Sequence, residues 1–72
     1  MSEYSDLEKI ARYRNIVLTR TCTVIAGGLL LTEITIGEVN VPKWKISGVD
    51  AQDVVDRTSS ALHLYIQEFR NA

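Results

Sequence analysis

The first third of the chain changes from one hydrophobic spacing to another. Between about Ser5 and Asn15, apolar side chains recur at the three- and four-residue intervals of a helix, and Ser5 and Glu8 have the spacing of a capping box. From Ile16 onward the residues are mostly β-branched, which favours a strand. The sequence therefore predicts a helix over residues 5–15 followed by a strand. One side of this helix carries Leu7, Ile10, Ala11 and Arg14.

Two glycines, Gly27 and Gly28, separate two apolar runs in the middle of the chain. Glycine adopts positive φ without steric cost, so this pair predicts a two-residue hairpin turn. The turn fixes the register of the two strands, and side chains alternate between the two faces of the ribbon. One face would pair Ala26 with Leu29, Val24 with Leu31, Cys22 with Glu33 and Arg20 with Thr35. The other face would pair Ile25 with Leu30, Thr23 with Thr32, Thr21 with Ile34 and Thr19 with Ile36.

The isoleucine and threonine face of this hairpin is the one expected beneath the helices. The opposite face is left with apolar side chains near the turn, and Arg20 diagonal to Glu33 indicates that it becomes polar farther away. One helix layer covers only one face of a sheet, so a second protein molecule is expected on the other. The predicted protein interface consists of Val24, Ala26, Leu29 and Leu31, extended by Leu64 from the last helix.

A third strand and a second helix complete the chain. Residues Val39 to Ile46 alternate as in a strand, and Pro42, which has no amide hydrogen, confines it to an edge or forces a bulge. Asp50 is a suitable N-cap for a helix from Ala51 to Arg70. The apolar stripe of this helix is Val54, Val55, Thr58, Ala61, Leu62, Tyr65, Ile66 and Phe69. The expected fold class is α+β, in the order α-β-β-β-α, with a three-stranded antiparallel sheet and two helices packed on one face.

The chain is short enough that a core of its own is only marginally sufficient. At 72 residues it is expected to form one domain over residues 1–72, and domains of this size often add a disulfide, a metal or a partner subunit. Cys22 is the only cysteine and His63 the only histidine, which excludes an intramolecular disulfide and a structural zinc site. We therefore expect a homodimer without metal or cofactor.

Charge and hydropathy give no indication of nucleic-acid or membrane binding. The net charge of −1 provides no attraction to nucleic acid or anionic lipid. The apolar run from Val24 to Leu31 is far shorter than the roughly 20 residues that span a bilayer, and the N-terminus is acidic and polar, unlike a secretory signal. Together with a single thiol, these features predict a cytoplasmic protein.

Three groups of residues with reactive side chains do not combine into a catalytic set. His63 lies opposite the apolar stripe without an orienting carboxylate, so we expect a solvated surface histidine. Cys22 is expected to be a small packing residue on its strand. Thr58, Ser59 and Ser60 have no assigned base and are expected to bond back to the preceding helical turn. We therefore expect that the protein is not an enzyme.

Lys43 and Lys45 flank Trp44 in the one basic and aromatic cluster of the sequence. On a strand the two lysines share a face and Trp44 points to the other. Trp44 is therefore expected under a helix with Ile46, and the lysines are expected to keep an edge strand soluble. An exposed edge also binds partners by strand addition. The candidate partner contacts are Lys43, Lys45, Arg20 and Glu33.

The order α-β-β-β-α is also that of the double-stranded RNA-binding domain, which binds duplex phosphates through lysines at the start of its last helix. The corresponding segment here, residues 50–56, contains three acidic residues and no lysine. Acidic side chains repel phosphates, so the shared order of elements brings no function with it.

These features favour a small non-enzymatic protein-interaction module. It would self-associate through the apolar hairpin face and bind or inhibit another protein, as phage- or mobile-element-type inhibitors of host machinery do. The alternative is a dimeric nucleic-acid-binding regulator that uses Lys43, Lys45, Arg12, Arg14 and Arg20. A third class, a dimer with a small-molecule pocket at the subunit junction, also remains open.

Overall fold

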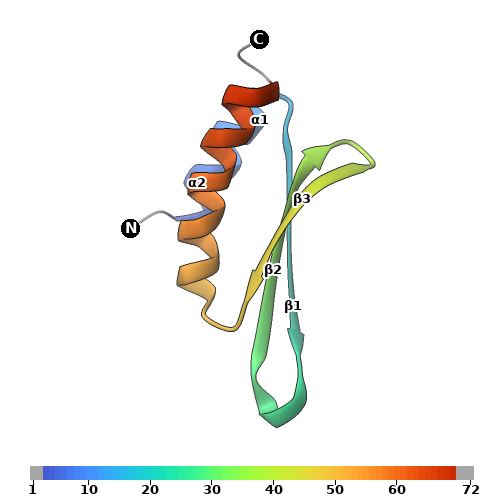
Figure 1. The fold of residues 1–72 in the computed structure, drawn as a ribbon, viewed down its shortest axis with the longest axis vertical. Coiled ribbons are helices and arrows are strands. Elements are labelled where there is room, and N and C mark those ends of the chain that lie inside the picture. The colour runs from blue at the N-terminus through green and yellow to red at the C-terminus, as the bar shows by residue number, and fades with distance from the viewer. Residues whose placement is uncertain (1–2, 70–72) are drawn as a thin grey trace.

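The computed structural model describes residues 3–69 and has the predicted order of elements, α-β-β-β-α. The three strands form one antiparallel sheet in the order β1-β2-β3, and both helices lie on the same side of it (Figure 1). The predicted fold class is confirmed. The elements are α1 (Tyr4–Arg12), β1 (Val17–Val24), a 3-10 turn (Ala26–Gly28), β2 (Leu30–Glu38), β3 (Val41–Gly48) and α2 (Ala51–Phe69).

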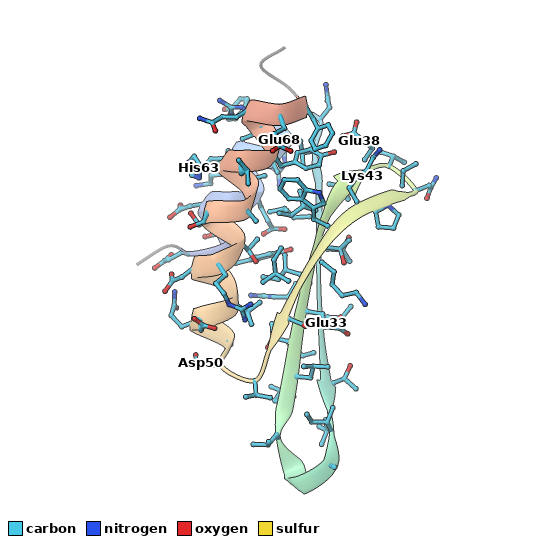
Figure 2. All side chains as sticks on the ribbon, viewed as in Figure 1. Glu33, Glu38, Lys43, Asp50, His63 and Glu68 are labelled. Atoms are coloured by element: carbon cyan, nitrogen blue, oxygen red, sulfur yellow. The ribbon has the colours of Figure 1, made fainter. Side chains whose placement is uncertain are left out.

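The core lies between α2 and the sheet, where side chains from both layers meet (Figure 2). Helix α2 buries most of the stripe predicted for it, and α1 adds Leu7 and Ala11 beside it. From the sheet, Ile34 and Ile36 of β2 are completely buried. Trp44 and Ile46 of β3 pack against this core, as predicted. The buried residues of α2 are Val54, Val55, Thr58, Leu62, Tyr65 and Ile66.

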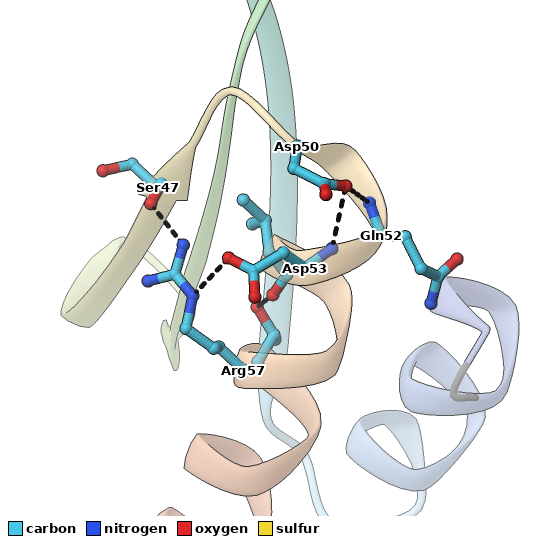
Figure 3. Close-up of polar contacts among 7 residues, drawn as sticks. Ser47, Asp50, Gln52, Asp53 and Arg57 are labelled. Atoms are coloured by element: carbon cyan, nitrogen blue, oxygen red, sulfur yellow. Dashed lines mark hydrogen bonds and ion pairs between the residues drawn. The ribbon is translucent and has the colours of Figure 1, made fainter.

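Asp50 caps the start of α2, as the sequence predicted. Its Oδ1 accepts hydrogen bonds from the backbone amides of Gln52 and Asp53, at 3.1 and 3.2 Å (Figure 3). One turn later, Arg57 donates from Nε to Asp53 and from Nη2 to the carbonyl of Ser47 at the end of β3, at 3.0 and 2.7 Å. These contacts satisfy the free amides of the helix start and tie α2 to the sheet.

The first helix differs from its prediction at both ends. It begins at Tyr4 after Glu3, which makes no side-chain cap bond, so the predicted capping box is wrong. It ends at Arg12 because Asn15 has a φ of 56°, which is outside the right-handed helical region. The chain turns there, and the amide of Ile16 donates to the carbonyl of Ala11 at 2.9 Å.

The hairpin turn contains three residues, Ala26–Gly28, and the predicted two-residue turn is wrong. The amide of Ile25 donates to the carbonyl of Leu29 at 2.8 Å, which makes this the closing pair. Gly27 and Gly28 both have positive φ, at 81° and 76°, so the reason for the two glycines was identified correctly. The extra loop residue shifts the pairing by one position.

This shift moves the side chains of β1 to the opposite face from the one predicted, since side chains alternate along a strand. Val24 pairs with Leu30, Cys22 with Thr32 and Arg20 with Ile34, all on the face that carries the helices. The open face, away from the helices, carries Thr19, Thr21 and Thr23 of β1 with Leu31, Glu33 and Thr35 of β2. The predicted pairs Val24 with Leu31 and Cys22 with Glu33 are therefore wrong, whereas the faces of Thr32, Ile34 and Ile36 are correct.

Strand β3 is an edge strand with a bulge, which combines the two outcomes predicted for Pro42. Ile36 pairs with Trp44 and Gly37 with Pro42, so Lys43 is the additional residue between them. The predicted strand from Val39 to Ile46 is displaced by two residues to Val41–Gly48. Neither of the helices within residues 3–69 is long and apolar enough to cross a membrane.

Candidate protein-interaction surface

The hairpin formed by β1 and β2 extends beyond the ends of both helices (Figure 1). Every residue from Thr19 to Leu30 is exposed. Four large aliphatic side chains lie at its end, which we call the hairpin tip: Val24, Ile25, Leu29 and Leu30, with 70, 37, 53 and 48% of their surface exposed. An apolar cluster of this kind at the end of a protruding element is typical of a binding site.

The hairpin tip presents apolar side chains on both faces of the ribbon. Val24 and Leu30 form a cross-strand pair on the helix side, but they lie past the helices. Ile25 and Leu29 belong to the open face, because side chains alternate along each strand. The prediction of two apolar faces is thus confirmed, but Ile25, which was expected under the helices, is exposed.

The predicted interface residues do not form one patch. Ala26 lies exposed in the turn, while Leu31 is half-buried and pairs with Thr23 on the open face, opposite to Val24. Leu64 is 48% exposed but lies in the second half of α2, at the end of the molecule far from the hairpin tip (Figure 1). The structure therefore separates Leu64 from the other four. Sequence reasoning missed Leu30, because the wrong register placed it beneath the helices.

On the helix face of β1, Arg20 lies over the ring of Tyr4 from α1, with its guanidinium carbon 4.3 Å from the ring centre. The register places Arg20 on the face away from Glu33, where it makes this cation–π contact, so the predicted diagonal pair is not formed. Burial of the Tyr4 hydroxyl raises its pKa above the ordinary value of 10.0; Glu8 raises it further, and Arg20 opposes the shift. The fold therefore favours the neutral phenol.

The raised pKa of Tyr4 predicts a loss of stability at alkaline pH. Well below pH 10 the phenol is neutral in both states, and its contribution is complete. As pH rises towards the higher pKa of the folded state, the Tyr4 phenol ionises more readily in the unfolded state. The free energy of unfolding therefore falls. Tyr4→Phe keeps the ring and should flatten the decline above pH 10 in urea unfolding curves. Tyr13→Phe is the control, because Tyr13 is 88% exposed; equal slopes for both variants would contradict the assignment.

The basic side chains proposed for nucleic-acid binding are dispersed. Lys45 lies on the open face and pairs with Glu33 at 3.2 Å, whereas Arg20 is on the helix face. Glu33 points away from the helices (Figure 2). Arg12 and Arg14 are at the end of α1, where Arg14 donates to the carbonyl of Ile10. These positions do not make a continuous basic surface, and one lysine is neutralised by its neighbour.

The reactive residues remain apart from one another. His63 is exposed, as predicted, and its Nδ1 donates to the carbonyl of Ser59 at 2.7 Å. Cys22 is exposed and 3.9 Å from the hydroxyl of Thr32, so the expectation of a packing residue is wrong. Thr58 donates to the carbonyl of Val54 at 2.7 Å, as expected of a helix hydroxyl. Within residues 3–69, no three histidine, cysteine or acidic side chains are grouped to bind a metal ion.

Within the described part of the chain, grooves lie on both sides of the start of β1. The first, of about 200 Å³, is between the end of α1 and the start of β1 and is lined by Glu8, Ala11, Arg12, Ile16, Val17 and Leu18. The second, of about 480 Å³, is on the other side of the same strand end and includes Thr19, Thr35 and the residues of the β2–β3 turn. Both grooves border β1, opposite the end of the strand that carries the hairpin tip.

Comparisons of this chain with protein-family models, curated proteins and solved structures found no match.

Proposed function

We propose that the protein is a small, non-enzymatic interaction module that associates with a second copy of itself through its hairpin and binds another protein with its remaining surface. The single observation that supports this proposal is the exposure of the hairpin tip. Val24, Ile25, Leu29 and Leu30 are clustered on both faces of the ribbon's end, which neither helix covers. Burying such side chains in an interface is favourable by about 25 cal/mol per Å². The cytoplasmic location expected from the single thiol is part of the same proposal.

The low net charge of the chain favours self-association over binding to a highly charged partner. The net charge is −1, so two copies repel each other weakly. The described residues also provide no disulfide that would compensate for a small core, and Cys22 is free. A second subunit adds buried apolar surface that one chain of this size lacks.

The test is the solution mass of the wild type and of Leu29→Glu with Leu30→Glu, measured by light scattering. The wild type should be a dimer and the double variant a monomer with an unchanged circular dichroism spectrum. The fold should survive because both side chains are already about half exposed in the single chain. A monomeric wild type, or a double variant that keeps the dimer mass, would refute the proposal.

Two single variants show whether the effect is local to the hairpin tip. Val39 is 71% exposed in the β2–β3 turn at the opposite end, so Val39→Glu should leave the dimer intact. Leu64→Glu tests the predicted extension of the interface onto α2, and the separation seen in the structure predicts that it too stays dimeric.

The open face of the sheet is the surface left for another protein. It carries threonines from β1 and β2, the Glu33–Lys45 ion pair and the larger groove, and no described element covers it. Thr35 is half-buried at its centre. Thr35→Arg should abolish the capture of a host protein that the wild type binds, while the mass of the protein itself stays unchanged. Equal capture by both would place the partner elsewhere.

A further inference from the structure

Strand β1 is an edge strand without the proline and the bulge by which proteins block unwanted pairing. It has eight residues, no proline and no bulge, and it lies at the outside of the sheet. The other edge, β3, has Pro42, a bulge at Lys43 and the charge of Lys45. Pro, bulges and lysines are what natural sheets use to protect their edges. The chain thus protects one edge and leaves the other able to pair.

The free hydrogen-bonding groups of β1 follow from the closing pair of the hairpin. The amide of Ile25 points towards β2, where it donates to Leu29. In an antiparallel pair the residues alternate, so the odd-numbered residues of β1 direct both backbone groups at β2 and the even-numbered residues direct theirs outward. The outward residues are Leu18, Arg20, Cys22 and Val24.

We propose that β1 pairs antiparallel with β1 of a second copy, centred on Thr21, so that the two three-stranded sheets become one continuous sheet. This inference rests on the proposed function, because it names the surface through which the module self-associates. A twofold axis perpendicular to the sheet keeps the helices of both copies on the same face. The pairing is an addition of one strand to the edge of another.

The register follows from overlap and charge. The eight residues of β1 overlap most when the axis passes at Arg20 or at Thr21. An axis at Arg20 would place two arginines directly opposite each other, which is unfavourable. An axis at Thr21 places Arg20 opposite Cys22 of the second copy and Leu18 opposite Val24. On the open face it sets threonine opposite threonine, a favourable cross-strand pair.

The same register brings the hairpin tip of each copy beside the first groove of the other. Val24 is 70% exposed, and Leu18, its expected partner, lines the groove between α1 and β1. Ala11 and Ile16 also line this groove and are buried in the core of their own chain. The uncovered end of one hairpin would therefore lie next to the α1 helix of the other copy. The last turns of the two α1 helices, which line the grooves, would lie at opposite ends of the β1 pair, whereas Tyr4 at the start of each helix would lie over Arg20, near the axis.

A second copy is the occupant that these observations favour over a foreign strand. A foreign strand needs only the free edge, whereas the second copy also brings Val24 to the groove beside Leu18 and places Cys22, not another arginine, directly opposite Arg20. The exposed tip and the groove lie at opposite ends of β1 in one chain. An antiparallel twofold pair brings both into contact at once.

Disulfide trapping tests the register directly. The backbone groups of Thr21 point to β2, so Thr21 and its copy would form a non-hydrogen-bonded pair with Cα atoms about 4.5 Å apart. That distance lies at the short end of the range that a disulfide spans. Thr21→Cys with Cys22→Ser should convert to a covalent dimer under mild oxidation, seen on a non-reducing gel. Thr19→Cys with Cys22→Ser should not, because its expected partner is Thr23.

Mixing two cysteine variants provides the positive control for Thr19→Cys. Thr19→Cys and Thr23→Cys, both with Cys22→Ser, should form a mixed disulfide when combined, although neither forms one efficiently alone. If Thr21→Cys is trapped no better than Thr19→Cys while the wild type is a dimer, the strand pairing is refuted and the hairpin tip remains as the interface. If the wild type is a monomer, the proposed function and this inference both fail.

Proline at an outward position tests the edge itself. Cys22→Pro removes an amide hydrogen that does not bond to β2, so the hairpin should persist while the dimer is lost. Cys22→Ala is the matched control and should stay dimeric. A dimeric Cys22→Pro with normal circular dichroism would contradict the pairing. If Cys22→Pro does not fold, the disulfide-trapping experiment alone tests the strand pairing.

Discussion

Replacing Tyr65 with alanine is expected to lower the free energy of unfolding by about 3–5 kcal/mol, the range for removing a large buried aromatic side chain. Tyr65 is only 1% exposed and is the largest fully buried side chain among residues 3–69. Its ring centre lies 5.2 Å from that of Trp44 and 4.8 Å from that of Phe69, so the loss would open a cavity at the centre of an aromatic cluster. Domains of this size have little more stability than that.

Denaturant unfolding at fixed protein concentration measures this effect, with the fluorescence of Trp44, the only tryptophan, as the signal. Tyr13→Ala removes the same side chain from a position that is 88% exposed and should change stability by less than about 0.5 kcal/mol. Similar losses in both variants would show that α2 does not pack on the sheet as described.

Tyr65→Phe separates packing from hydrogen bonding. The hydroxyl of Tyr65 donates to Oε2 of Glu38 at 2.8 Å, and this bond joins α2 to the end of β2. Its removal should cost about 1–3 kcal/mol because the acceptor is a carboxylate. If Tyr65→Phe lowers the free energy of unfolding nearly as much as Tyr65→Ala, the hydrogen bond contributes more to stability than the packing of the ring.

Gly37→Ala is expected to destabilise the protein by about 1–3 kcal/mol, and towards the upper end of that range. Gly37 is buried opposite the bulge of β3, and an added methyl carbon would lie 2.8 Å from the Cα of Pro42 and 2.9 Å from the amide nitrogen of Lys43. These obstructing atoms are backbone, so the bulge itself has to shift. Urea unfolding monitored by circular dichroism gives the loss.

The control for this second prediction is Gly48→Ala. There the new methyl carbon would meet Nη2 of Arg57 at 2.8 Å, the end of a long and exposed side chain that can move aside with the loss of its hydrogen bond to Ser47. The nearest fixed neighbour is Cγ2 of Val54 at 3.1 Å. The cost should be smaller than at Gly37. If Gly48→Ala is the more destabilising variant, the bulge is not the tightest backbone contact in the sheet.

The prediction of α2 succeeded because its apolar stripe is long and regular. Residues such as Val54, Leu62 and Tyr65 recur over several turns at helical spacing, and Asp50 marks the start. The face of β2 was also predictable, since Ile34 and Ile36 are its strongest apolar positions and both are buried. Where apolar residues recur strongly on one side of a helix or strand, only one orientation of that element buries them.

The face of β1 was not predictable in the same way. Its residues alternate between threonines on one side and Leu18, Arg20, Cys22 and Val24 on the other, and neither set is clearly apolar. The register therefore depended on whether the glycine turn contained two or three residues. Both turns use glycine at positive φ, so the dipeptide alone does not distinguish them.

The wrong hairpin register affected the prediction of the interaction surface more than the prediction of the fold. The sequence predicted apolar excess at the hairpin end, and the exposed tip confirms it. It did not reveal that Val24 and Leu31 lie on opposite faces, that Arg20 is held by Tyr4, or that a groove lies beside Leu18. These relations depend on how separate elements pair and pack.

The sequence by itself determined the order of elements, the buried stripe of α2, the core face of β2 and the excess of apolar side chains near the glycines. These are local properties, because each depends on the spacing of residues within one segment. The tertiary structure alone decided the hairpin register, the free edge of β1 and the groove between α1 and β1. They depend on how segments pair and pack, where one loop residue more or less turns a whole strand over.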